Sequence, residues 1–221
     1  FHVNADALDE LLFVLALAAR RYGVRVHAYC VLSNHYHLVV TDPHARLPAF
    51  CQYLDGLVAR ALNSLRGRWE NFWAPDSYSA VSLATPQDVL EKAAYVLANP
   101  VAAGLVRSGR AWPGLWSGPE LVGTTVVASR PSHFFSSEGA LPQSVALRLT
   151  APPGFDSAKA FAEALAGRRL KSGWGLQVLR YGPGDYAGPH NDHHPENAAA
   201  ISETVVPVKV TAIPVVRTAA R

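Results

Sequence analysis

The sequence is poor in the residues that would mark a secreted or membrane protein. Its 221 residues include only two cysteines, Cys30 and Cys51, and no methionine. Two cysteines in apolar surroundings cannot build a disulfide framework, so we expect both to be reduced core residues of a cytoplasmic protein. No run of about 18 apolar residues occurs, and we therefore expect no membrane span. The missing methionine, also at position 1, suggests a fragment or a processed chain.

A strong charge of either sign is also missing. Lysine and arginine number 20 against 17 acidic residues, which gives a formal net charge of +3. This balance permits a nucleic-acid partner without requiring one. Because 49% of the residues are hydrophobic and 17% are charged, we expect a folded, soluble chain of one or two domains.

Hydrophobic periodicity predicts an alternation of helices and strands up to residue 105. Apolar residues recur at helical spacing between capping residues, glycine or proline, and β-branched runs lie between them. The helices are expected at 4–23, 47–67 and 85–100, and the strands at 24–33, 35–41 and 78–84, with a tight turn at Ser33-Asn34. The order α-β-β-α-β-α predicts an α+β fold, with an antiparallel sheet and its helices on one face.

The pattern loosens after residue 105. One more helix is expected at 155–171, and the last 40 residues are rich in glycine, proline, asparagine and histidine. We therefore divide the chain into a domain at 1–125 and a partly irregular C-terminal extension at 126–221.

The stretch "YCVLSNHYHLVVT", residues 29–41, carries two histidines at positions i and i+2. Side chains two apart on a strand leave the same face, so His35 and His37 would emerge together. Imidazole pairs are common ligands of divalent ions. The spacing predicts a metal site, and the alternative is a pair of histidines on a solvated strand face.

The expected helix at 85–100 offers a partner for this pair. Tyr95 and Asn99 are four residues apart and share a helix face. Asn99 has an amide oxygen suited to a metal. The Tyr95 phenol, with an ordinary pKa of ~10, is a weak nucleophile that a metal or base must assist. The alternative is that Tyr95 packs in the core and Asn99 caps the helix before Pro100.

Two motifs in this order resemble those of a known family. "YCVLSNHYHLVV" at 29–40 and "YVLANPVAAGLV" at 95–106 resemble the IS200-like single-tyrosine transposases, in the branch associated with repetitive extragenic palindromes. These belong to the HUH superfamily, named for two histidines that flank a hydrophobic residue, here Tyr36. The resemblance covers residues 5–125.

The resemblance implies a ferredoxin-like antiparallel sheet and a metal-dependent DNA strand transferase. His35 and His37 would be ligands of magnesium or manganese, and Asn99 would take the place of the third ligand. Tyr95 would attack a single-stranded DNA phosphodiester and leave a 5′-phosphotyrosine intermediate and a free 3′-hydroxyl. Family members commonly act as dimers, so the partners implied are single-stranded or hairpin DNA and a second copy of the chain.

A basic and aromatic segment is the candidate for DNA contact. Arginines interleaved with aromatic rings suit single-stranded nucleic acid, since charge binds phosphates and rings stack on bases. The candidates are Arg60, Arg66, Arg68 and Trp69, followed by Phe72 and Trp73, with a second group at Arg107, Arg110, Trp112 and Trp116. The alternative is a solvated helix face beside a small hydrophobic cluster.

Both ends of the chain depart from the family pattern. The family domain opens with a central strand, whereas here the helix follows almost directly on Phe1-His2-Val3. We therefore expect a truncated first strand and, as the alternative function, an inactive transposase-derived protein that still binds nucleic acid.

The C-terminal stretch "LRYGPGDYAGPHNDHHPE" looks like part of a 2-oxoglutarate-dependent oxygenase. His190 and Asp192 form the H-x-D that begins a facial triad for non-haem iron. The triad needs a second histidine well downstream, and no histidine follows His194. An oxygenase fragment is thus the less favoured alternative.

Overall fold

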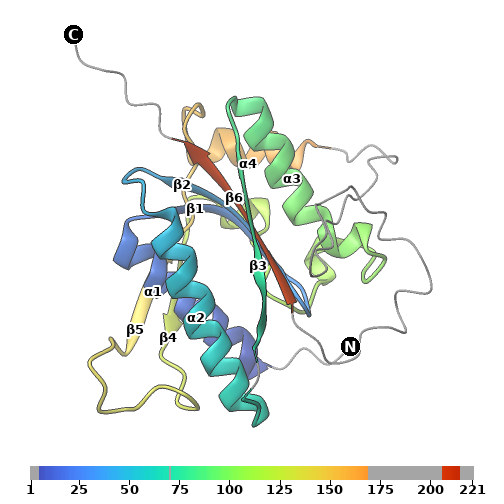
Figure 1. Ribbon diagram of the computed structural model, residues 1–221. Helices are drawn as coiled ribbons and strands as arrows, with labels where there is room; N and C mark the ends of the chain where they lie inside the picture. The colour runs from blue at the N-terminus through green and yellow to red at the C-terminus, as the bar shows by residue number, and fades with distance from the viewer. Residues whose placement is uncertain (1–4, 70, 169–205, 215–221) are drawn as a thin grey trace.

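The computed structural model describes residues 5–69, 71–168 and 206–214 (Figure 1). Its helices are α1 (Ala5–Tyr22), α2 (Leu47–Arg66), α3 (Pro86–Ala102) and α4 (Ala158–Ala166), with single 3-10 turns at Gly109–Ala111 and Pro119–Leu121. Its strands are β1 (Arg25–Val31), β2 (Tyr36–Asp42), β3 (Trp73–Ser82), β4 (Thr125–Ser129), β5 (Ser144–Arg148) and β6 (Val206–Pro214). The predicted α+β class is confirmed. None of the described helices is long and apolar enough to cross a membrane.

The four-stranded sheet has the order β1-β2-β6-β3. The predicted hairpin of β1 and β2 is present and antiparallel, with Arg25 opposite Thr41 and Val31 opposite Tyr36. The prediction of a wholly antiparallel sheet is wrong, because β6 pairs in parallel with both β2 and β3. Sequence pattern cannot reveal this pairing, since β6 joins strands that lie more than a hundred residues before it.

Helices cover both faces of this sheet, so the prediction of helices on one face is also wrong. Leu38 and Val40 of β2 pack into the core that α1 and α2 supply, whereas Val39 between them packs with α3 and α4. Neighbouring side chains on a strand point to opposite faces, so the two helix pairs lie on opposite sides. Figure 1 shows α1 and α2 side by side, apart from α3 and α4.

The two helices nearest the site begin or end at clear sequence signals. At the start of α3, the Thr85 hydroxyl accepts a hydrogen bond from the Asp88 amide, and the Asp88 carboxylate accepts one from the Thr85 amide. This capping box, with Pro86 in the first turn, fixes where α3 begins. Gly67, with a φ of 61°, ends α2.

The predicted end of α3 at Pro100 is wrong, because the helix continues to Ala102. Proline inside a helix removes the hydrogen bond of its missing N–H and crowds the carbonyl four residues before it, but it does not remove the bonds that follow. The next bonds still form: the Asn99 carbonyl accepts from Ala103 N at 2.9 Å, and the Pro100 carbonyl accepts from Leu105 N at 3.0 Å. The chain turns away at Gly104, whose φ is 69°.

Beyond residue 125, the β4–β5 hairpin was not predicted. Val145 and Leu147 of β5 are buried in the core with α1, while Phe161 and Leu165 of α4 are buried with α3. The predicted helix at 155–171 begins at Ala158, where the Ser157 side chain caps it, and ends at Ala166. Residues on both sides of the proposed boundary at 125 therefore share the same two cores.

Strand β6 lies between β2 and β3, where the expected truncation would leave a gap. If a strand preceded α1, then α1 would be the crossover that connects it to β1, and the two strands would be parallel. It would therefore be antiparallel to β2, whereas β6 is parallel to β2. Residues 1–3, on which the predicted remnant strand falls, lie outside the described residues.

Cys30 and Cys51 are both buried and free, as predicted. Burial raises the pKa of the Cys30 thiol to about 12. At neutral pH this thiol is therefore protonated and behaves as a small apolar side chain.

Candidate functional site

The β1–β2 hairpin places the two histidines together, as the spacing predicts. His35 lies immediately before β2, where its carbonyl accepts a hydrogen bond from Leu32 N at 2.8 Å, and His37 is the second residue of the strand. Their ring centroids are 4.8 Å apart and the rings are almost perpendicular, at 89°. His35 is half-buried, whereas His37 is only 4% exposed.

Asn34, assigned to the turn by the sequence analysis, also orients a histidine. Its Oδ1 lies 2.8 Å from Nδ1 of His35. An amide oxygen only accepts hydrogen bonds, so Nδ1 carries the proton and Nε2 keeps its lone pair. When an imidazole binds a metal through one ring nitrogen, a hydrogen-bond acceptor on the other nitrogen fixes the tautomer. The turn sequence Asn34-His35 is the signal that identifies this role.

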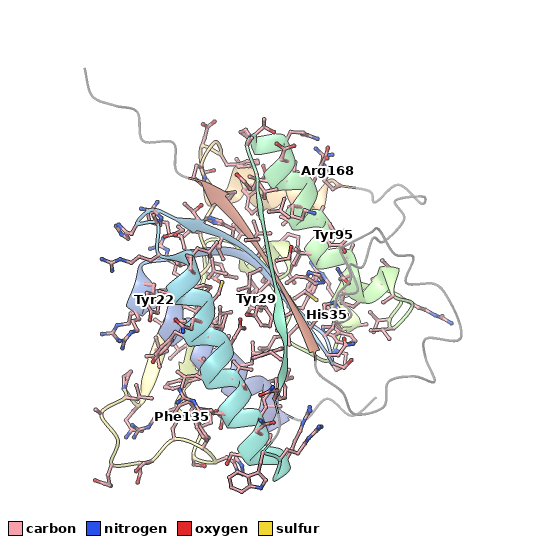
Figure 2. All side chains as sticks on the ribbon, in the orientation of Figure 1. Tyr22, Tyr29, His35, Tyr95, Phe135 and Arg168 are labelled. Atoms are coloured by element: carbon pink, nitrogen blue, oxygen red, sulfur yellow. The ribbon has the colours of Figure 1, made fainter. Side chains whose placement is uncertain are left out.

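Helix α3 brings Tyr95 to the histidine pair. The Tyr95 ring centroid lies 5.8 Å from that of His37, with the planes at 83°. Tyr95 is half-buried, so its side chain is neither enclosed in the core nor fully exposed. Figure 2 shows His35 and Tyr95 in the region where the β1–β2 hairpin meets α3.

Asn99 lies four residues, about 6 Å, beyond Tyr95 along the same face of α3. Its side chain is buried, with 2% exposed, and its Nδ2 has no hydrogen-bond partner within the described residues. A buried amide donor without a partner costs about 1–3 kcal/mol. Asn99 does not cap the helix, because α3 continues past it. The alternative of a helix cap is therefore wrong.

Lys92 is a neighbour of Tyr95 that the sequence analysis missed. It lies one turn before Tyr95 on α3, and its Nζ is 4.9 Å from the centroid of the Tyr95 ring. Burial lowers the pKa of the Lys92 amine, since desolvation disfavours the charged form. The i, i+3 spacing from Tyr95 could have identified it.

The donor set fits a divalent ion only in part. Among the described residues, no group of three or more histidine, cysteine, aspartate or glutamate side chains is placed to hold a metal. Two imidazoles and the amide of Asn99 remain. Magnesium and manganese both prefer oxygen ligands, whereas imidazole is a common ligand of zinc, copper, iron and nickel. A magnesium or manganese ion at this set would therefore require further oxygen ligands from outside the chain.

The candidates for DNA contact lie near the end of α2. Trp69 is 97% exposed, and the Arg66 guanidinium lies 5.6 Å from the centroid of the Phe72 ring. Arg68 is half-buried, whereas Arg60 is exposed and donates from Nε to the Gly56 carbonyl.

This segment is close to the start of β2. Trp73, which follows it, has its ring centroid 5.9 Å from that of Tyr36, the residue between the two histidines. The structure thus brings the basic and aromatic segment to the same end of the sheet as the histidine pair.

The second basic and aromatic group is partly structural. The indole N–H of Trp112 donates to the Val31 carbonyl at 2.9 Å, and that of Trp116 donates to the Leu97 carbonyl at 2.8 Å. Trp112 is only 7% exposed. These tryptophans hold the segment after α3 against the sheet and are not exposed stacking platforms. His190 and Asp192, the candidate iron ligands, lie outside the described residues.

No protein family, no curated protein and no solved structure matches this chain.

Proposed function

We propose that this chain is an IS200-like single-tyrosine transposase domain that nicks and rejoins single-stranded DNA. The observation that carries the proposal is the contact between the Tyr95 and His37 rings, 5.8 Å apart, beside a second histidine ring. A phenol next to an imidazole pair is a nucleophile next to potential metal ligands, and these come from separate elements, β2 and α3.

In the proposed reaction Tyr95 is the nucleophile. Its oxygen forms a bond to the phosphorus, the bond from phosphorus to the 3′ oxygen breaks, and the 3′ oxygen takes up a proton. The DNA is then held as a 5′-phosphotyrosine, so a second strand end can reverse the step without loss of the phosphodiester energy. The capping box of α3 and the packing of this helix on the sheet would hold Tyr95 in a fixed position, which in-line attack requires.

The divalent ion would be held by His35, His37 and Asn99. When bound it supplies Lewis-acid polarisation of the phosphoryl oxygen. The hydrogen bond from Nδ1 of His35 to Asn34 Oδ1 sets the tautomer in which Nε2 carries the lone pair that a metal ion would bind. Asn99 is buried, and the atom that would bind the ion is Oδ1, because the amide N–H groups only donate.

The DNA path we propose runs over the end of α2. Arg66, Arg68 and the exposed ring of Trp69 would contact the strand that enters the site, with charge for phosphates and a ring for an unstacked base. Arg60 lies further back on α2 and would extend the contact. We also propose that the sheet derives from a ferredoxin-like one. Such a sheet has one central strand between the positions of β2 and β3, and the order of β1, β2 and β3 around that position agrees with it.

The test is covalent capture of DNA. The folded protein is incubated with labelled hairpin DNA and Mn²⁺ and analysed on a denaturing gel, beside Tyr95→Phe. Tyr22→Phe is the matched control, because Tyr22 is another half-buried tyrosine in an edge-to-face ring pair, on α1. We expect a protein–DNA adduct in the wild type and in Tyr22→Phe only.

Binding of the hairpin without any adduct would refute the catalytic proposal and support the inactive binding module. An adduct that survives Tyr95→Phe would show that another residue is the nucleophile. The partner state is measured on the same protein by sedimentation, where the family resemblance leads us to expect a dimer.

A further inference from the structure

Lys92 is a cation that α3 places beside the proposed nucleophile. Its Nζ lies 4.9 Å from the centroid of the Tyr95 ring. The two residues are three apart, so they share the face of α3 that meets His37. Lys92 is half-buried, and an ammonium partly withdrawn from water acts more strongly on a neighbouring charge than an exposed one.

The acidic residues next to Lys92 on α3 are engaged elsewhere. Glu91 lies 3.8 Å from the Arg168 guanidinium, and the Asp88 carboxylate is part of the capping box with Thr85. In the described parts of the chain, no carboxylate lies within ion-pair distance of Lys92. A half-buried cation without a counter-charge, next to a phenol, is an environment that an anion would complete.

We propose that Lys92 is a catalytic residue that holds the scissile phosphodiester of the DNA against Tyr95. The inference rests on the proposed function and adds a residue that the motif resemblance does not supply. The ammonium contacts a non-bridging phosphate oxygen in the ground state. As the Tyr95 oxygen attacks, negative charge builds on those oxygens, and a fixed cation in a partly desolvated site stabilises it.

The proton balance of the step does not involve Lys92. The phenolic proton of Tyr95 passes to solvent, the new bond joins the Tyr95 oxygen to phosphorus, and the departing 3′ oxygen takes a proton from solvent. Lys92 stays an ammonium throughout, so its contribution is electrostatic and depends on charge alone.

A structural role for Lys92 makes a different prediction. Long cationic side chains bury their methylene stems against apolar surfaces, and the Lys92 stem could simply cover the Tyr95 ring. Lys92→Met keeps an unbranched stem and removes the charge, whereas Lys92→Arg keeps the charge. The two roles therefore give opposite rankings of these variants.

The experiment measures single-turnover formation of the covalent adduct on hairpin DNA with saturating Mn²⁺, together with hairpin affinity by fluorescence anisotropy. We expect Lys92→Met to slow adduct formation by about ten- to a hundredfold, the scale of a lost electrostatic contact to the transition state. Lys92→Arg should retain most of the rate. Lys159→Met is the charge-matched control, because Lys159 is exposed on α4 and pairs with Glu163 at 3.8 Å.

The outcomes separate the two proposals. If the wild type forms an adduct and Lys92→Met forms it equally fast, Lys92 has no catalytic role and the proposed function stands. If Lys92→Met and Lys92→Arg are slowed equally, geometry and not charge is what matters, and the proposal is wrong. If the wild type forms no adduct, the transposase function fails and the role of Lys92 fails with it. Circular dichroism confirms that each variant is folded.

Discussion

His27 should make this fold sensitive to mild acid. The side chain is 1% exposed, and both ring nitrogens are engaged, Nδ1 with the Thr150 carbonyl at 2.7 Å and Nε2 with the Thr41 hydroxyl at 2.8 Å. Because a carbonyl only accepts, Nδ1 carries the proton and Nε2 accepts from Thr41. Both ring nitrogens of the neutral imidazole are thus hydrogen-bonded, and the side chain links β1 to β2 and to the segment after β5.

Burial, aided by the charge of Arg25, lowers the pKa of His27 from 6.5 to about 4. The unfolded chain therefore takes up a proton on His27 at a higher pH than the folded chain does. Stability from this group is complete above pH 6.5 and is lost as the pH falls from 6.5 towards 4. At 1.36 kcal/mol per pKa unit, the full loss is about 3 kcal/mol, of which about 2 kcal/mol falls between pH 7 and pH 5.

The assay is urea unfolding of the wild type and of His27→Gln at pH 7 and pH 5. Glutamine can donate to the Thr150 carbonyl and accept from Thr41, but it does not titrate. We expect the free energy of unfolding of the wild type to fall by about 2 kcal/mol more than that of the variant between the two pH values. All other ionisable groups are the same in both proteins, so the difference isolates His27. Equal falls would refute the reasoning.

Three further substitutions test other parts of the structure. Tyr36→Phe removes the hydroxyl that donates to Asp55 Oδ1 at 2.5 Å. We expect urea unfolding to show a free energy of unfolding lower by about 1.5–3 kcal/mol, the value of a hydrogen bond to a charged group. An unchanged free energy of unfolding would contradict this. Trp69→Ala, at a side chain that is 97% exposed, should leave the melting temperature unchanged and weaken hairpin binding by about 1–3 kcal/mol; equal affinities would remove Trp69 from the DNA path. Val210→Pro, in the middle of β6, should lower the free energy of unfolding by at least about 1–3 kcal/mol in urea, because the proline leaves a backbone acceptor unpaired. A variant as stable as the wild type would mean that the sheet does not need β6.

Local signals in the sequence located most elements up to residue 102. The Thr85-Pro86 start of α3 and the glycine at 67 after α2 act through bonds within a few residues, so their effect can be predicted without tertiary structure. Strand β3 is the exception. It was expected at 78–84 and runs from Trp73 to Ser82. Its first residue, Trp73, pairs with Val206 of β6, so pairing with a distant strand, and not the local pattern, decides where it begins.

Features that depend on distant contacts could not be predicted. Strand β4 lacks a clear alternation, whereas β5 buries Val145 and Leu147 at alternate positions against α1. Strand β6 pairs with β2 and β3, which lie more than a hundred residues before it. For the same reason the burial of His27 was not foreseen, since its two partners lie 14 and 123 residues away.

The site itself was predictable to the extent that it depends on spacing. The two histidines follow from period 2 on a strand, and Tyr95 with Asn99 from period 3.6 on a helix. What spacing cannot give is that α3 packs on the histidine face of β2 and not on the other. That choice is made by apolar residues such as Val39 and Val96, which are buried together in one core.

The alternation His35-Tyr36-His37 combines a residue that packs in the core with two that belong to the proposed site. Tyr36 points to the α1–α2 core, where its hydroxyl donates to Asp55 and its ring meets Trp73. That anchorage fixes the register of β2, because a slip of one residue would turn Tyr36 to the α3 face and both histidines into the core. The large, buried residue between the histidines is thus what keeps the imidazoles facing Tyr95. A histidine pair on a less firmly held strand could have the same spacing and still fail to present both rings to one ion.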